Sequence, residues 1–199
     1  NDETPARIGV HTQPARILIM GLSYLFSHVM GYILRRLQYG AMLVQNAIGW
    51  LAIFSACYVA YSMGANNAGN AVGPIANLGI VPTKTLLFIG GLSIAIGAAT
   101  YGRKVADTVG KGITPLDIPG AFVAQISSAF GMHLFSMLGI PVSTSSAIVG
   151  AVVGVGLVKG ANAIRRKTII TIMAGWVCTP ILAGVSSFVL YRLMNLFLT

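Results

Sequence analysis

Two short polar strings interrupt the long uncharged stretches of this 199-residue chain. The first is Gly64-Ala65-Asn66-Asn67-Ala68-Gly69-Asn70-Ala71, and the second is Pro141-Val142-Ser143-Thr144-Ser145-Ser146. Lipid cannot satisfy amide groups, hydroxyl groups or backbone that glycine interrupts, so such strings survive at membrane depth only around a cavity or a ligand. We therefore expect the chemistry of the protein at these two places.

The second string has the residues to start a helix and to bind an anion. Serine and threonine cap helix N-termini, so a half-helix is expected to begin between Ser143 and Ser145. Its free N–H groups and positive dipole end would face an anion, and the hydroxyl groups would add donors. Broken helices with such ends near the membrane midplane recur in secondary transporters. A serine-capped loop between two ordinary spans accounts for the same residues equally well.

The first string offers both donors and acceptors. Asn66, Asn67 and Asn70 carry amide oxygens that can coordinate Na⁺ and amide hydrogens that can donate to an anion. Their spacing places Asn66 and Asn67 near Asn70 on one face of a helix. Asparagine also joins helices inside membranes, but three within five positions beside several glycines favour a binding role.

A further polar face precedes the second string. Gln125, Ser128 and Ser136 share one face of a helix, and His133 lies beside that face. These residues fit either the lining of the same cavity or an ordinary contact between helices. We favour packing for His133 and leave both interpretations open for Gln125 and Ser128.

The elements that must hold these residues are membrane helices. The chain is 55% hydrophobic and 9% charged, whereas soluble domains carry about 25% charged residues. Five uncharged runs are long enough to hold spans of about 20 residues. None alternates with a period of two, which argues against a β-barrel. The composition therefore predicts an all-α polytopic membrane protein.

The runs also predict the order of the elements. Residues 1–16 are expected to form a polar loop or linker, and residues 17–199 a transmembrane domain. Within it we expect spans at about 17–34, 41–63, 85–101 and 168–191, and a helical hairpin at 119–158. Glycines and Pro74 predict a broken helix near 64–74. Most of the charge falls in a predicted loop at 102–117, and Pro180 predicts a kink.

The hairpin is expected to be re-entrant. Both flanks of the run 118–158 are basic, so it enters and leaves on the same side of the membrane. Two full spans would satisfy this as well. The second arm, Thr144 to Val158, has 15 residues, or about 22 Å of helix. The hydrocarbon core is about 30 Å thick, so the short arm favours a tip inside the membrane.

The basic residues behind the formal net charge of +9 lie beside the predicted spans rather than in one patch. Basic residues at 35–36, 103–111 and 159–167 each lie beside a hydrophobic run, the pattern of cytoplasmic loops in a cell-membrane protein. This placement argues against a nucleic-acid partner and leaves the lipid bilayer as the surroundings. No aspartate or glutamate lies within the uncharged runs, so the chain supplies no buried carboxylate for a proton relay.

At the two strings the sequence resembles the inorganic phosphate transporter (PiT) family. That family carries a Gly-Ala-Asn-Asp-x-Ala-Asn signature and a Pro-Val-Ser-Thr-[Thr/Ser] hairpin motif, once in each of two inverted halves. The stretches 64–70 and 141–145 match these motifs. Further matches are Gly73-Pro74-Ile75-Ala76, Gly102-Arg103-Lys104-Val105 and Ile113-Thr114-Pro115-Leu116. Their order and spacing agree over roughly 50–190.

The resemblance implies a secondary transporter rather than an enzyme, with no cofactor beyond a coupling ion. Such a protein imports inorganic phosphate with Na⁺ by alternating access. Ser143, Thr144 and Ser145, with Asn66 and Asn70, would bind phosphate. The cation would be bound by Asn66, Asn67, Asn70 and Gln125.

Two departures from the family pattern matter. The signature aspartate is replaced by Asn67, which removes a negative charge from the expected ion site. Each motif also occurs once, so the chain resembles one inverted repeat, the C-terminal half. The other repeat half, or pairing of two copies as a homodimer, would complete the site.

Other functions compete with phosphate symport. Sulfate is a tetrahedral oxyanion that the same donors would bind, and a scaffold or sensor derived from a transporter half would fit the single repeat. An intramembrane serine hydrolase with His28 or His133 as base would need a nucleophile elbow, and no Gly-x-Ser-x-Gly motif is present.

Overall fold

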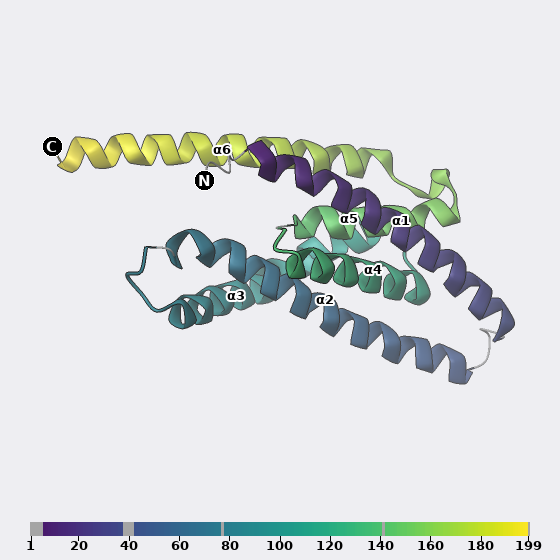
Figure 1. The fold of residues 1–199 in the computed structure, drawn as a ribbon. Helices are drawn as coiled ribbons and strands as arrows, with labels where there is room; N and C mark the ends of the chain where they lie inside the picture. The colour runs from purple at the N-terminus through teal and green to yellow at the C-terminus, as the bar shows by residue number, and fades with distance from the viewer. Residues whose placement is uncertain (1–5, 38–41, 77, 141, 199) are drawn as a thin grey trace. The chain divides into compact units, whose positions relative to one another are not determined.

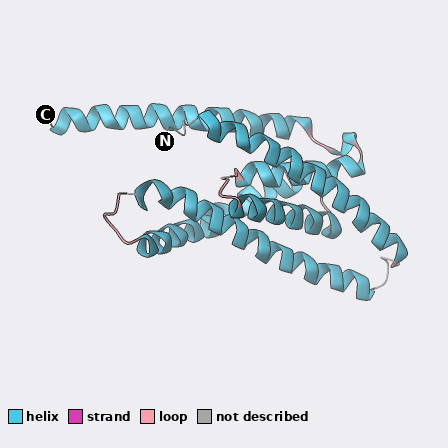
Figure 2. Ribbon diagram, in the orientation of Figure 1, coloured by secondary structure: helices cyan, strands magenta, loops and turns pink. Residues whose placement is uncertain are grey.

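The computed structural model describes residues 6–37, 42–76, 78–140 and 142–198, and these residues are almost entirely helical (Figures 1 and 2). The helices are α1 (Ala6–Arg36), α2 (Met42–Ala76), α3 (Thr83–Gly112), α4 (Ile118–Met137), α5 (Thr144–Lys159) and α6 (Arg166–Leu198), with a 3₁₀ turn at Ala161–Ala163. The chain divides into two compact units, Asn1–Ile164 and Arg165–Thr199. The predicted all-α fold is confirmed.

Within the described residues, five stretches of helix are long and apolar enough to cross a membrane. They are Ala15–Arg36, Met42–Ala76, Thr83–Gly112, Ile118–Met137 and Arg166–Asn195. Many of their large apolar side chains are exposed, as contact with lipid requires. Helix α5, with 16 residues, is shorter. The prediction of a multi-pass membrane protein is therefore confirmed.

The predicted break of the helix near 64–74 is wrong. Helix α2 continues without interruption to Ala76, with Pro74 inside it. Pro74 lies close to the C-terminal end, where losing one N–H removes only one of the last intrahelical hydrogen bonds. Burial of Ser62, Asn66 and Val72 holds this part of the helix in place. The turn comes later, where Gly79 adopts a φ of 66°.

Two predicted loops are helical over most of their length. Helix α3 continues to Gly112, so the expected loop at 102–117 is reduced to 113–117. Asp107 and Lys111 pair at 2.7 Å across one turn, which supports a solvated helix end. Helix α1 already begins at Ala6, so the expected linker at 1–16 is not a loop from that residue onward. In the second unit, α6 runs through Pro180 as one helix.

Helices α4 and α5 form the predicted hairpin, and α1 packs closely against its second arm. A Cβ atom added to Gly154 would lie 2.5 Å from the carbonyl oxygen of Met20 and 3.0 Å from the Cβ of Ser23. One added to Gly150 would lie 3.2 Å from the backbone of α1. Ser23 Oγ also donates to the carbonyl of Ala151 at 2.8 Å. Small residues and a serine hydroxyl therefore fix α5 against α1.

An ion pair joins the two outer ends of the hairpin. Asp117 caps α4 by accepting from the N–H of Gly120 at 3.2 Å. Lys159 Nζ, in the last turn of α5, lies 2.8 Å from Asp117 Oδ1 and donates to the carbonyl of Pro115 at 3.0 Å. The start of α4 and the end of α5 therefore lie at the same level.

The charge state of Asp117 makes this ion pair stable at neutral pH. Partial burial opposes ionisation, but the hydrogen bond and charge of Lys159, with the N–H groups of Asp117 and Gly120, outweigh it. The pKa of the Asp117 carboxyl is therefore held below its ordinary value of 3.8. A lowered pKa stabilises the fold above the ordinary value, and this contribution is lost as the pH falls through the folded-state pKa.

The contact between α1 and α5 can be tested at Gly154. We expect Gly154→Ala to lower the melting temperature of the purified protein in detergent, because the new methyl group meets backbone that cannot rotate away. Overpacking of this kind costs about 1–3 kcal/mol. The matched control is Gly91→Ala in α3, where nothing lies within 4 Å of the new atom. Equal melting temperatures for the two variants would contradict the close packing.

Candidate functional site

The tip of the α4–α5 hairpin begins with a glycine that ends α4. Gly139 has a φ of 70°, a left-handed conformation that residues with a Cβ atom rarely adopt. Its N–H donates to the carbonyl of Ser136 at 3.0 Å, and the N–H of Ile140 donates to that of Phe135 at 2.9 Å. These two bonds form a Schellman motif and satisfy carbonyls that the helix end would otherwise leave open.

Helix α5 begins at a serine cap, as the sequence predicts. Ser143 has extended backbone, with φ −68° and ψ 109°. Its Oγ accepts from the N–H of Ser146 at 3.4 Å and from the hydroxyl of Ser146 at 3.0 Å. The N–H groups of Thr144 and Ser145 come first in the helix and have no acceptor within α5. Pro141, the first residue of the predicted string, lies outside the described residues.

The two polar strings meet in space. Asn66 Nδ2 donates to the carbonyl of Val142 at 2.9 Å, and both residues are buried. Thr144 Oγ1 donates to Asn67 Oδ1 at 3.5 Å. Two consecutive asparagines of α2 thus hold the backbone and the first side chain of the α5 N-terminus. The hydrogen bond between Thr144 and Asn67 joins residues 77 positions apart in the chain.

The accessible side of this tip carries hydroxyl groups. Ser143 and Ser145 are exposed, whereas Thr144 and Ser146 are buried. Asn70, one turn beyond Asn66 on the same face of α2, is also exposed. An anion approaching the tip would therefore meet two serine hydroxyls and the N–H groups of Thr144 and Ser145, which have no acceptor within α5.

Gln125 lies on α4 and contacts α2 well away from the polar string. Its Oε1 accepts from Ser55 Oγ at 2.5 Å, and Ser55 precedes Asn66 by 11 residues, or about 16 Å of helix. The structure therefore separates Gln125 from the asparagines with which the sequence grouped it. Ser128 is buried and donates to the carbonyl of Ala124 within its own helix, while Ser136 is exposed.

His133 lies in the contact between α2 and α4. Its ring centroid is 5.9 Å from that of Tyr58 and 6.4 Å from that of Tyr61. This placement agrees with the packing role expected from the sequence. Among the described residues, no three His, Cys, Asp or Glu side chains gather to hold a metal ion. The oxygen donors at the tip are amides and hydroxyls, which suit an alkali cation better than a transition metal.

Two polar features of the first unit, Asn1–Ile164, were not predicted from the sequence. One is the ion pair of Asp117 with Lys159. Its sequence signal was that Asp117 lies two residues before Pro119, because an aspartate followed closely by a proline commonly starts a helix. The other is Ser62, which is 3% exposed and whose hydroxyl has no hydrogen-bond partner among the described atoms. Ser62 lies one turn before Asn66, so the buried face of α2 is polar beyond the string itself.

Comparisons with known proteins identify the family of this chain. The phosphate transporter family matches the chain over residues 18–187. A Pyrococcus abyssi protein with the name "Putative phosphate permease" is 39% identical over 153 residues, which cover 71% of this chain and 38% of that protein. The chloroplastic inorganic phosphate transporter 2-1 of Arabidopsis thaliana is 33% identical over 150 residues, which cover 69% of this chain and 26% of that protein.

A solved structure shares the fold. It is titled "The sodium-dependent phosphate transporter" and has a TM-score of 0.58 and 27% sequence identity, covering 82% of this chain and half of that one. The fold thus defines a multi-pass helical membrane protein. The chain belongs to the phosphate transporter family, and it spans less than two thirds of the length of these relatives.

The contact between the strings predicts a difference between two asparagines. Asn66→Leu should destabilise the protein by about 1–3 kcal/mol, because the buried carbonyl of Val142 loses its donor. Asn70→Leu, at an exposed position four residues later, is the control and should change stability little. Thermal unfolding in detergent measures both. If Asn70→Leu proved the more damaging change, the hydrogen bond from Asn66 would not be what holds the tip.

Proposed function

We propose that the complete protein carries inorganic phosphate across the cell membrane by symport with a cation, Na⁺, in an alternating-access cycle. The observation that supports this most is the tip of the α4–α5 hairpin, where Asn66 and Asn67 hold the capped start of α5. Relatives named as phosphate transporters and a solved structure titled as sodium-dependent support the same function.

The anion would bind at the exposed side of the tip. Ser143 and Ser145 offer hydroxyl donors, and the N–H groups of Thr144 and Ser145 point out of the first turn of α5. The helix dipole adds partial positive charge at the same place. Each donor is neutral, so phosphate can be released without breaking a strong ion pair. That property suits a transporter, which must let its substrate go.

The cation would bind beside the anion through neutral oxygens. Asn66 uses its amide nitrogen on Val142, which leaves its carbonyl oxygen for another partner. Asn67 Oδ1 already accepts from Thr144, so a cation there would bridge α2 and the hairpin tip. In a site of low dielectric, the cation and the anion would neutralise each other and favour joint binding.

The charged outer ends of the helices support a proposal for the orientation in the membrane. Arg35 and Arg36 end α1, and the Asp117–Lys159 pair joins the ends of the hairpin. We place these ends in the cytoplasm because basic loops favour that side. The hairpin would then enter and leave from the cytoplasm with its tip in the membrane. The partner half, from the same polypeptide or a second copy, would face the exposed serines.

Removing one donor should weaken phosphate binding without unfolding the tip. We expect Ser145→Ala to raise the Kd for radiolabelled phosphate about tenfold, because a hydrogen bond to a charged group is worth about 1.5–3 kcal/mol. Thr144→Val should act in the same direction. Ser136→Ala, at an exposed position in α4 outside the tip, is the control. Phosphate affinity unchanged in Ser145→Ala and Thr144→Val would refute the site, and competition by sulfate at equal concentration would favour a general oxyanion carrier.

Restoring the family's carboxylate should strengthen dependence on the cation. Asn67→Asp should lower the Na⁺ concentration needed for half-maximal phosphate uptake into proteoliposomes by about tenfold. A charge about 4 Å from the cation is worth several kcal/mol before desolvation at an effective dielectric constant near 20. Asn70→Asp, which is exposed, should have a smaller effect. An identical Na⁺ titration in Asn67→Asp and the unmodified protein would remove Asn67 from the cation site.

A further inference from the structure

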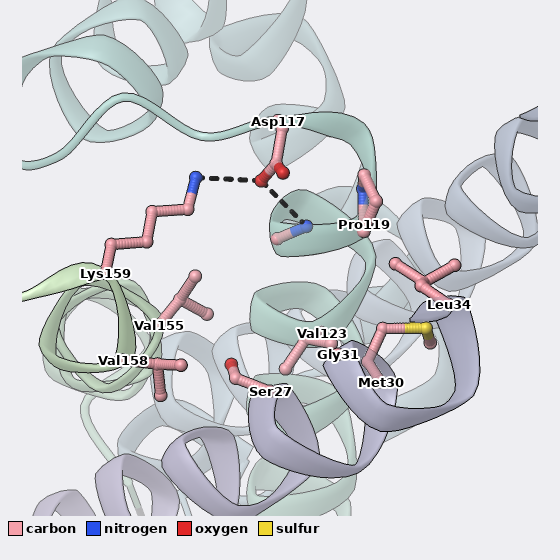
Figure 3. Close-up of a pocket in the computed structure, with 11 residues that line it drawn as sticks. Ser27, Met30, Gly31, Leu34, Asp117, Pro119, Val123, Val155, Val158 and Lys159 are labelled. Carbon is pink, nitrogen blue, oxygen red and sulfur yellow. Dashed lines mark hydrogen bonds and ion pairs between the residues drawn. The ribbon is translucent and has the colours of Figure 1, made fainter. Parts of the chain in front are cut away.

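A cleft lies at the opposite end of the hairpin from the polar tip, between α1, α4 and α5 (Figure 3). Its volume is about 120 Å³. Most of its lining is apolar and comes from Met30, Leu34, Val123, Val155 and Val158. Asp117 and Lys159 form one side of the cleft, joined by their ion pair. The cleft therefore combines a hydrocarbon-like interior with charged groups at one edge.

The position of the cleft matches the boundary between hydrocarbon and headgroups. Three helix ends meet there: α1 ends at Arg36, α4 begins at Ile118 and α5 ends at Lys159. The apolar stretches of α1 and α4 also end or begin at these residues. Lysine and arginine at such ends place their charges among lipid headgroups. The molecules that surround this cleft in the bilayer are therefore phospholipids.

The charge around the cleft favours an anionic headgroup. Lys159 uses two acceptors within the protein, Asp117 Oδ1 and the carbonyl of Pro115, and a lysine ammonium has three N–H groups. Arg35 follows Gly31 by four residues, so it lies on the cleft-lining face of α1, one turn further out. It is exposed, and Arg36 adds a further positive charge beside it. These cations outnumber the single carboxylate of Asp117.

We propose that this cleft binds an anionic phospholipid, with its phosphate at Lys159 and Arg35 and part of an acyl chain between α1, α4 and α5. A free phosphate ion fits less well, because the interior of the cleft is apolar and Asp117 lies at its edge. A bound lipid would fill the space between α1 and the base of the hairpin and steady it. Since about 22 Å of helix separates this base from the tip, lipid binding is independent of the ion that the tip carries.

Gly31 allows the cleft to be filled without disturbing the fold. It lines the cleft, and a Cβ atom built on it meets nothing within 4 Å. Gly31→Leu therefore places a side chain where the acyl chain would lie. Gly21, on the same helix, likewise has no neighbour within 4 Å of an added Cβ atom, but it lies outside the cleft. Gly21→Leu is the matched control.

The experiment compares two lipids with the full-length protein purified in detergent. Phosphatidylglycerol and phosphatidylcholine with identical acyl chains are added, and the melting temperature is followed against lipid concentration. We expect phosphatidylglycerol to raise it at lower concentration in the unmodified protein and in Gly21→Leu, and this preference to vanish in Gly31→Leu. Arg35→Gln should weaken the apparent affinity for phosphatidylglycerol about fivefold while leaving the fold intact.

Equal responses to the two lipids in the unmodified protein would overturn the proposal. So would a folded Gly31→Leu variant that keeps the full preference for phosphatidylglycerol. If Gly31→Leu does not fold, Arg35→Gln decides, because its exposed side chain makes no contribution to the interior of the cleft. An affinity unchanged in Arg35→Gln would then reject the anionic lipid site.

Discussion

The hydrogen bond from Asn66 to the carbonyl of Val142 is the interaction on which the site depends. A helix end leaves backbone groups without intrahelical partners, so they need partners from elsewhere. Asn66 supplies one partner and Ser143 supplies another through its cap on Ser146. The first N–H groups of α5 have no acceptor within the helix, and these are the groups that we propose bind the anion. The same side chains that stabilise the tip thus define which donors it presents.

Two other contacts determine where that tip is held. Gly150 and Gly154 bring α5 against the backbone of α1, and Lys159 joins the end of α5 to Asp117 at the start of α4. These contacts join the hairpin to α1, so any movement of the hairpin would carry α1 with it. Helix α2 contacts it along α4 and at the tip. A cycle that alternates access would break or remake the contacts of Asn66 and Asn67, because these link α2 to the start of α5.

Much of this arrangement could be predicted from local patterns in the sequence. The uncharged runs located the spans, and Ser143 located the start of α5, because both signals depend on nearby residues. The predicted helix break near 64–74 was wrong. Gly69 and Pro74 disfavour a helix locally, but packing of buried Ser62, Asn66 and Val72 outweighs this preference. The pairing of Gln125 with Ser55 could not be predicted, because it depends on how α2 and α4 align. The ion pair of Asp117 with Lys159 could not be predicted either, because it forms only when α4 and α5 pack together as a hairpin.

The most direct test follows hydrogen exchange at the tip of the hairpin in the purified full-length protein. We expect inorganic phosphate to slow exchange of the N–H groups of Thr144 and Ser145, because the bound anion would accept from them. Chloride at the same concentration should have little effect, and amides in α3 should not respond to either ion. If exchange at Thr144 and Ser145 is the same with and without saturating phosphate, phosphate does not bind at the tip of the hairpin.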